Sequence, residues 1–352
     1  MSQRIDALLL QGLIVAADDA ARSGGRPTTA YAFNRSARMV LAADLGVTHA
    51  RVAVADLGGA ILAERATDLP ISRGPEPTLS WVLDAFHELL AECGHTFAEV
   101  CGVGIGLPGP VEHGTGKTVS PPIMPGWNGF PVPSWFGTRL GVPVLVDNDV
   151  NIMTLGEHWA AHPDADHLVF VKMGTGIGCG IITGGRLHRG AQGSAGDIGH
   201  IRVPAVDPVL CRCGNSGYLE AVAGGEALAA QLRILGLEAF DSRDVVRLVK
   251  MGNTPAIRLV RQCGREVGGV LASIVNFFNP AVIMIGGDLA EAGEHLLAGV
   301  REVVYARSPP LATQRLGIRA SQLGDRAGVM GAAAMVIEHV LAPEAVDQPN
   351  SA

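Results

Sequence analysis

The sequence has few cysteines for its length, no long apolar run and no excess of positive charge. Six cysteines in 352 residues do not make the framework of a disulfide-rich secreted domain, and they suit a reducing cytoplasm better. No stretch approaches the roughly 18 consecutive apolar residues of a membrane span. The apolar stretch 8–17 is interrupted by Gln11, and Arg4 before it is offset by Asp6, so a secretory signal is not expected. These absences predict a cytoplasmic protein.

The net charge of −7 also argues against a chain that binds polyanions over its whole surface. Residues 1–39 are the exception, because they hold five Arg and only three Asp. At 352 residues and 48% hydrophobic content, the chain is long enough for two cores. We therefore expect two lobes that face a cleft, with a separate basic N-terminus.

Residues 1–38 predict a short helix (3–11), a strand (13–17), a glycine-containing turn (21–27) and a second strand (28–33). A helix followed by a hairpin is the back half of a winged helix-turn-helix, and Arg22 and Arg26 at the hairpin tip are placed to touch DNA. The helices that should cover its apolar side do not precede Met1. A shortened start or an evolutionary remnant is expected, and a disordered tail is the alternative.

Two segments repeat the same arrangement of strand, glycine turn and strand. The first contains DLGVT, in which Asp44, Gly46 and Thr48 surround a turn, and the second contains Gly174, Thr175 and Gly176. Such turns let backbone N–H groups approach a phosphate. Two copies, one in each half, predict related lobes that close over a nucleotide.

Between these segments lie a predicted helix (78–93), a buried strand (100–111) and two polar candidates. Asn128 follows Trp127 in a Gly/Pro-rich loop, where it is either a sugar hydroxyl partner or a turn residue. Asp149 follows a buried strand in the run DNDVN. A carboxylate at the mouth of a cleft suits a general base, although Asp149 could equally cap the following helix.

The stretch from Gly190 to Glu220 places His200, Cys211 and Cys213 beside two carboxylates, Asp197 and Glu220. Imidazole and thiolate suit Zn²⁺, and the Cys-x-Cys pair could close a small loop around one ion. The alternative is a glycine-rich loop with two unrelated buried thiols. The rest of the chain predicts helices over 226–264, a buried strand that ends at Gly286 and Gly287, and a last helix over 326–340.

Taken together, the motifs DLGVT, GIGLPGPV, PGWNGFP, DNDVN, GTGIGCG, the glycine-rich run 190–200, CRCGNSGYLE and NPAVIMIGG resemble the signature set of the ROK family (repressor, open reading frame, kinase). The resemblance covers residues 39–340. It implies an α/β fold of the actin-like, hexokinase-type two-lobe class, built from duplicated ribonuclease H-like domains. The implied domains are a partial winged helix-turn-helix (1–38), an N-terminal lobe (39–148) and a C-terminal lobe (149–352) with a zinc-loop region (190–220).

The resemblance also implies roles for individual residues. Asp149, preceded by Asn148, matches the catalytic base. The positions that match the nucleotide-binding turns are Asp44, Gly46, Thr48, Gly174, Thr175, Gly176, Gly286 and Gly287. The positions that match sugar contacts are Asn128, Asn148, Asp149, Asp197, His200 and Glu220. His200, Cys211 and Cys213 match three of the family's four zinc ligands.

Two positions depart from the family pattern. Tyr218 stands where the family has a third zinc-binding cysteine, and phenolate is a rare ligand at structural zinc sites. Asp197 stands where the family has a glutamate, so a sugar contact is lost or bridged by water. Zinc binding and tight hexose binding are both weakened by these changes.

The N-terminal segment favours the family's repressors over its kinases, because dedicated ROK kinases begin near the first glycine turn. We therefore expect a sugar-responsive transcriptional repressor that forms a homodimer or a dimer of dimers, and that binds operator DNA only when its N-terminal domain is completed. The alternative is an ATP-dependent sugar kinase of glucokinase or N-acetylhexosamine kinase type. It would use Mg²⁺ and ATP, with Asp149 as the base.

Overall fold

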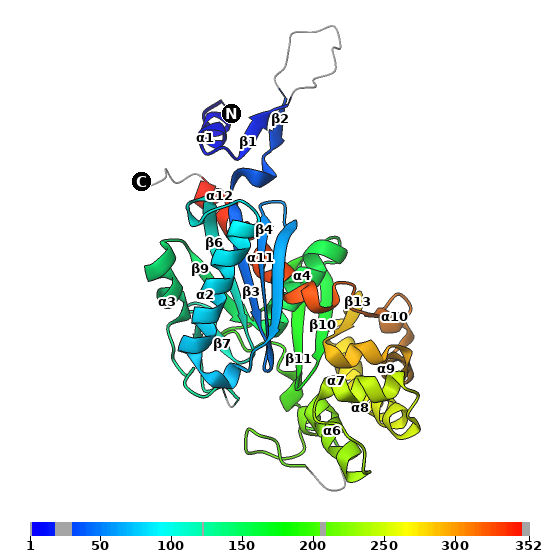
Figure 1. Cartoon of the computed structure of the whole chain (residues 1–352). Helices are drawn as coiled ribbons and strands as arrows, with labels where there is room; N and C mark the ends of the chain where they lie inside the picture. Colours follow the sequence, from blue (N-terminus) through cyan, green and yellow to red (C-terminus); the bar gives the residue numbers. More distant parts are fainter. Residues whose placement is uncertain (1, 18–29, 122, 205–208, 347–352) are drawn as a thin grey trace.

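A computed structural model of the chain describes residues 2–17, 30–121, 123–204 and 209–346. Figure 1 shows two lobes of mixed α/β structure, with the N-terminal helix and hairpin projecting beyond the end of the first lobe. The predicted two-lobed α/β class is confirmed. The hairpin tip that contains Arg22 and Arg26 lies outside the described residues.

The first lobe is built on a five-stranded sheet of order β5-β4-β3-β6-β9. The hairpin pairs β3–β4 and β4–β5 are antiparallel, whereas β6 and β9 join in parallel. Helices α2 (Pro75–Glu92) and α3 (Val132–Leu140) cover one face, and the short strands β7 (Val111–Glu112) and β8 (Lys117–Thr118) pair beside it. The strands are β3 (Met39–Leu45), β4 (His49–Asp56), β5 (Ile61–Asp68), β6 (Val100–Leu107) and β9 (Val144–Asn148).

The second lobe repeats this order with β12-β11-β10-β13-β14. Its hairpin pairs are again antiparallel, and β13 and β14 again join in parallel. The strands are β10 (His167–Met173), β11 (Ile177–Thr183), β12 (Arg186–Leu187), β13 (Val282–Gly286) and β14 (Gly317–Ala320). The outer helices are α5 (Leu219–Ala223), α6 (Gly225–Ile234), α7 (Ser242–Lys250), α8 (Thr254–Phe278), α9 (Glu294–Arg307) and α10 (Pro310–Thr313).

Two inner helices, α4 (Asp149–Ala161) and α11 (Ala327–Val340), pack against each other between the sheets. Helix α11 lies on β3 and β6, and α4 lies on β10 and β11. Their backbones nearly touch, because a Cβ added at Gly331 would stand 1.6 Å from the carbonyl oxygen of Ile152. Only glycine permits such an approach. The helix pair therefore couples the lobes closely.

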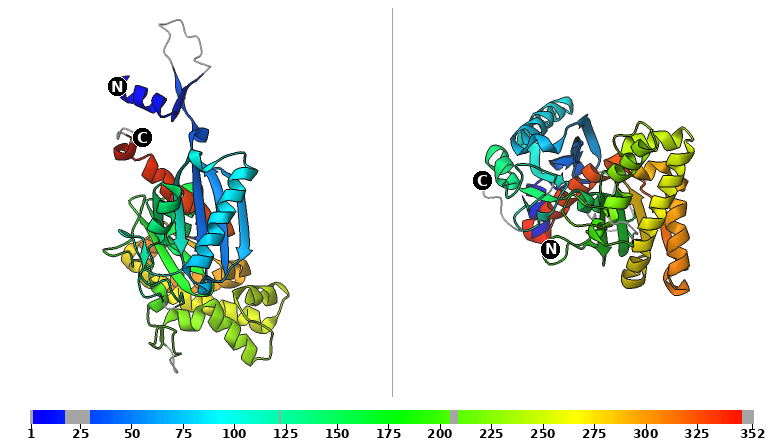
Figure 2. Two further views of the ribbon diagram at one scale, coloured as in Figure 1. Left: turned by 60° about the vertical axis from the view of Figure 1, so that its left-hand side comes forward. Right: turned by 90° about the horizontal axis from the view of Figure 1, so that it is seen from below.

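The N-terminal unit consists of α1 (Ser2–Leu10) and the antiparallel strands β1 (Ile14–Ala16) and β2 (Tyr31–Phe33). Leu13 is buried in the same apolar cluster as the end of α11. The side-chain amide of Gln11 donates to the carbonyl oxygen of Val346, 3.1 Å away, at the end of α12 (Pro343–Val346). Figure 2 shows α11 running through the first lobe toward this unit. Among the described residues, no helix is long and apolar enough to cross a bilayer.

Candidate functional site

A cavity of about 980 Å³ lies between the two sheets. Its lining includes Asp44, Thr48 and His49 from the first lobe, and Lys172 and the turn 174–176 from the second. The glycine turn therefore reaches the cavity just after the carboxyl end of β10, where open α/β sheets hold their ligands. The two repeated turns predicted from sequence face one shared cavity.

Two buried groups on the first lobe have shifted proton affinities. Burial raises the pKa of Asp44 to about 7, although the positive charge of Lys172 opposes the rise. Burial lowers the pKa of His49, and the charge of Lys172 adds to that effect. Both shifts favour neutral side chains on this wall of the cavity.

In the run DNDVN, Asn148 is the cap of helix α4 and Asp149 lines the cavity. The Val150 N–H donates to Asn148 Oδ1 at 2.9 Å, so Asn148 caps helix α4. The Asn148 amide also donates to the carbonyl oxygen of Gly109, 3.0 Å away. Asp149 is the first residue of the helix, is 4% exposed and lines the cavity. Asn148 is therefore the N-cap, although Asp149 Oδ1 also accepts from the Val150 N–H at 2.8 Å, and the Asp149 carboxylate lines the cavity.

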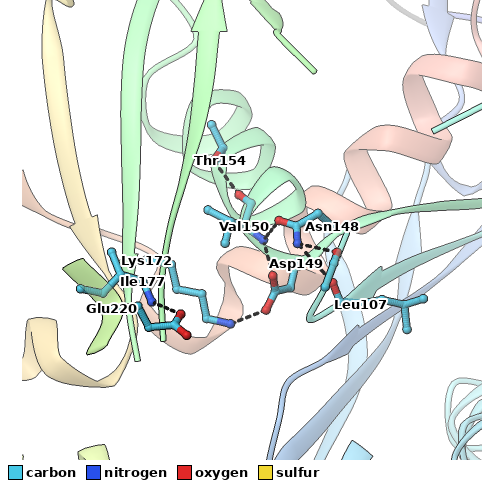
Figure 3. A network of polar contacts seen from close by, with 9 residues as sticks. Leu107, Asn148, Asp149, Val150, Thr154, Lys172, Ile177 and Glu220 are labelled. Atoms are coloured by element: carbon cyan, nitrogen blue, oxygen red, sulfur yellow. Dashed lines mark hydrogen bonds and ion pairs between the residues drawn. The ribbon is translucent and has the colours of Figure 1, made fainter. Parts of the chain in front are cut away.

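Lys172 is the partner of Asp149, and the sequence analysis did not identify it. Its Nζ lies 2.5 Å from Asp149 Oδ2, and Figure 3 shows the lysine reaching from β10 to the start of α4. Both side chains are largely buried, with 18% and 6% exposed. The only sequence signal was its position, since Lys172 precedes the second glycine turn by the same spacing as Asp44 precedes the first.

A second buried carboxylate, Asp147, connects the first sheet to the glycine-rich run 190–200. Its Oδ2 accepts from Arg189 Nε at 2.6 Å, and its Oδ1 accepts from the Asn151 amide at 2.7 Å. His113 Nδ1 lies 3.8 Å from the same carboxylate. Arg189 immediately precedes the glycine-rich run 190–200, so this ion pair joins that run to the first lobe. The sequence analysis missed this pair too.

Asp197 and His200 lie at the cavity on one short turn, η4 (Ile198–His200), and the residue before it. His200 Nδ1 is 2.7 Å from Asp197 Oδ1. Burial lowers the pKa of His200, but the hydrogen bond and charge of Asp197 outweigh it and leave the pKa raised. Glu220 does not line the cavity. Its Oε2 accepts from the Ile177 N–H at 3.2 Å, next to the glycine turn 174–176 (Figure 3).

The donor atoms of His200, Cys211 and Cys213 lie within 4.8 Å of one another. That spacing fits three ligands of one zinc ion. Because Asp197 holds Nδ1 of His200, Nε2 is the nitrogen left for a metal, an arrangement typical of metal-binding histidines. The Tyr218 ring packs edge-on against the His200 ring, with 5.2 Å between centroids.

Several predicted site residues lie outside the cavity lining. Asn128 is exposed, and its side-chain oxygen accepts from the Ser120 N–H at 2.8 Å. Gly287 lines the cavity, whereas Gly286 ends β13 behind it. The others that do not line it are Gly46, Glu220, Cys211 and Cys213.

The duplicated sheets, the shared cavity and the glycine turns define a two-lobed fold of the actin-like sugar kinase class. The ROK family model matches residues 40–339, so the chain belongs to the ROK family. The match spans both sheets and the inner helices.

Members with different functions resemble the chain. It is 29% identical to the xylose repressor of Caldicellulosiruptor bescii, over 97% of this chain and 88% of that protein. A solved ROK family transcriptional regulator, a homologue of the Escherichia coli MLC protein, superposes with a TM-score of 0.82 and 26% identity, over 98% of this chain and 89% of that one. A ROK glucokinase from Streptomyces griseus, solved with glucose and AMPPNP, gives a TM-score of 0.71 and 29% identity, over 84% of this chain and 98% of that one. Similarity to the two regulators therefore includes the N-terminal unit.

Proposed function

We propose that the chain is a sugar-responsive transcriptional repressor whose effector sugar binds in the cavity between the lobes. Asn148, Asp149, Asp197 and His200 supply hydroxyl partners there, and Glu220 supports the turn beside them. Asn128 stays a predicted sugar contact that would need its loop to move. Similarity to a xylose repressor and to a glucose-bound kinase makes D-xylose and D-glucose the first sugars to test.

The observation that carries the proposal is that helix α11 connects the cavity with the N-terminal unit. The short turn before it, η6 (Gly324–Arg326), brings Gly324 and Asp325 to the cavity. The other end of α11 packs in one apolar cluster with Leu13 of the N-terminal unit. A sugar that changes the closure of the lobes would therefore move the support on which the N-terminal unit rests.

The N-terminal unit is proposed to be the end of a winged DNA-reading domain. Helix α1 and the β1–β2 hairpin have the order of its second half. Such domains read two half-sites, so a homodimer on operator DNA in the cytoplasm is part of the proposal. Residues 39–148 and 149–352 are its two proposed effector lobes, with α11 of the second lying on the sheet of the first.

Zinc is proposed to bind at His200, Cys211 and Cys213. The ion would close the loop between the histidine and the two cysteines, and thereby hold His200 and Asp197 at the cavity rim. Tyr218 replaces the fourth ligand, so water completes the coordination.

The repressor proposal is tested by fluorescence anisotropy of an N-terminally extended version, in which the DNA-reading domain is completed, with DNA from upstream of the chain's own gene, titrated with and without sugar. We expect an effector sugar to weaken DNA binding. Leu13→Ala should keep sugar binding but reduce this effect, because it loosens the contact with α11. Leu235→Ala, at a residue 62% exposed on the second lobe, is the control. DNA binding that is unchanged by a sugar bound in the cavity would contradict the proposal.

The kinase alternative rests on the glycine turn 174–176 and Asp149, which share one cavity. A coupled assay for ADP formation over a panel of hexoses and acylated amino sugars tests it. Sugar-dependent turnover that Asp149→Asn abolishes would establish a kinase. Sugars that raise the melting temperature without turnover support the repressor.

A further inference from the structure

Lys172 is placed to reach into the cavity without obstruction. It is the second-last residue of β10, where its strand neighbours are Gly178 on β11 and Gly286 on β13. Neither neighbour has a side chain that could cover it. The lysine side chain therefore extends to Asp149, 2.5 Å away, and stays 18% exposed to the cavity.

Lys172 shares the cavity with several acidic residues. Burial lowers the pKa of its ammonium, but Asp149, Asp44 and Asp288 outweigh burial and leave the pKa raised. All four residues line the cavity. One ammonium thus faces three carboxyl groups contributed by both lobes.

Divalent cations bind in such places in phosphate-transferring sites, where carboxylates and phosphates supply oxygen ligands. Lysine offers no acceptor atom to a metal. Its charge would also repel a divalent ion held by the same carboxylates. The arrangement of Asp44, Asp149 and Lys172 therefore does not fit a magnesium ion in contact with Asp149.

We propose that the Lys172 ammonium takes the place of a divalent metal beside Asp149. It holds the Asp149 carboxylate in an ion pair. A paired carboxylate is a weaker base toward a sugar hydroxyl, because accepting a proton would leave the buried ammonium without its partner. Sugar binding in this chain consequently needs no divalent metal beside Asp149, and the cavity binds without transferring a phosphoryl group.

The inference rests on the sugar site of the proposed function, but its first test needs neither sugar nor DNA. The probe is Mn²⁺ alone, titrated into the full chain and followed by electron paramagnetic resonance. The variants are Lys172→Met, Asp149→Asn and the double variant. Wild type should hold no Mn²⁺ that depends on Asp149. Lys172→Met should gain one Mn²⁺ site, and the double variant should lose it again.

Lys172→Gln is the second variant, because it removes the charge and keeps a hydrogen bond to Asp149 if Lys172→Met fails to fold. It should gain the same Mn²⁺ site. A wild-type Mn²⁺ site that Asp149→Asn abolishes would overturn the inference, as would folded Lys172 variants that gain none. A purely structural ion pair predicts lower melting temperatures and no new metal site.

Calorimetry with D-xylose and D-glucose completes the test. A bound sugar should show the same Kd with and without added Mg²⁺ for wild type, in buffer without chelator so that the proposed zinc site keeps its ion. A wild type that needs Mg²⁺ and ATP for sugar binding, and a Lys172→Met variant that loses ATP binding, would instead make Lys172 a phosphate ligand and overturn the inference. Loss of DNA binding alone would refute the repressor proposal and leave the cation result intact.

Discussion

The two sheets share one strand order but end their central strands with opposite charges. Asp44 is the second-last residue of β3 and pairs with Gly106 on the next parallel strand. Lys172 is the second-last residue of β10 and pairs with Gly286 on its parallel neighbour. The duplicated scaffold thus brings a carboxyl group and an ammonium group to matching places on the two walls of one cavity.

This difference shows that a shared fold does not fix the chemistry of its cleft. The first lobe keeps the acidic residue that a cation would approach, and the second lobe supplies a cation of its own. The proposed role of Lys172 would make a single side chain at a repeated position the difference between a cavity that binds a sugar and one equipped to phosphorylate it.

The largest expected effect comes from breaking the helix contact that couples the lobes. Gly331→Ala would place a methyl group 1.6 Å from the Ile152 carbonyl oxygen. We expect a loss of about 3 kcal/mol or more in the free energy of unfolding, measured by urea denaturation. Gly137→Ala is the matched control, because it lies in α3 with nothing within 4 Å of the added Cβ. It should stabilise by about 0.5–1 kcal/mol, and equal losses in both variants would contradict the packing argument.

The opposed charges should respond unequally to neutralisation. Lys172→Met leaves Asp149 buried without its partner and should cost about 3 kcal/mol in the free energy of unfolding. Asp44→Asn replaces a carboxyl whose pKa of about 7 leaves it only partly ionised near neutral pH, so we expect a loss of less than about 1 kcal/mol there, or a gain. Denaturation of both variants at one pH tests the asymmetry, which equal costs would refute.

Removing the ion pair between Asp147 and Arg189 should have a smaller effect on the free energy of unfolding. Arg189→Met leaves Asp147 with its bonds to Asn151 and the Asn148 N–H, so we expect a loss of about 2 kcal/mol together with weaker sugar binding. Arg265→Met is the control, since its partner Glu302 is 47% exposed and such surface pairs contribute about 0–1 kcal/mol. Unchanged sugar affinity in Arg189→Met would show that this ion pair does not position the glycine-rich run 190–200 for sugar binding.

The smallest expected effect is in the pH dependence of stability, which Asp44 on the first-lobe wall of the cavity should alter. Because the folded-state pKa of Asp44 is raised from 3.8 to about 7, the folded state binds more protons than the unfolded state between these values. This group therefore favours folding at low pH, and its contribution is lost as pH rises toward about 7. Asp44→Asn should gain stability relative to wild type over that window. Thermal melts across it check the sign, and a parallel profile would contradict the shift.

The sequence was sufficient to predict the repeated glycine turns, the two-lobed class and the strand that leads up to Asp149. Those features depend on local patterns of apolar strands and turn residues. Lys172 and Arg189 could not be recognised in the same way, because their partners are 23 and 42 residues away in sequence. The contact between α4 and α11 was equally hidden, since a glycine in a helix does not reveal what it packs against.

The most direct test is calorimetric titration of D-xylose and D-glucose into the full chain in chelator-free buffer without Mg²⁺, followed by addition of Mg²⁺ and ATP with ADP measured in the same samples. We expect that an effector sugar binds without Mg²⁺, that Asp149→Asn weakens this binding and that no ADP forms. Sugar binding that requires Mg²⁺ and ATP, with ADP released at each turnover, would contradict this expectation.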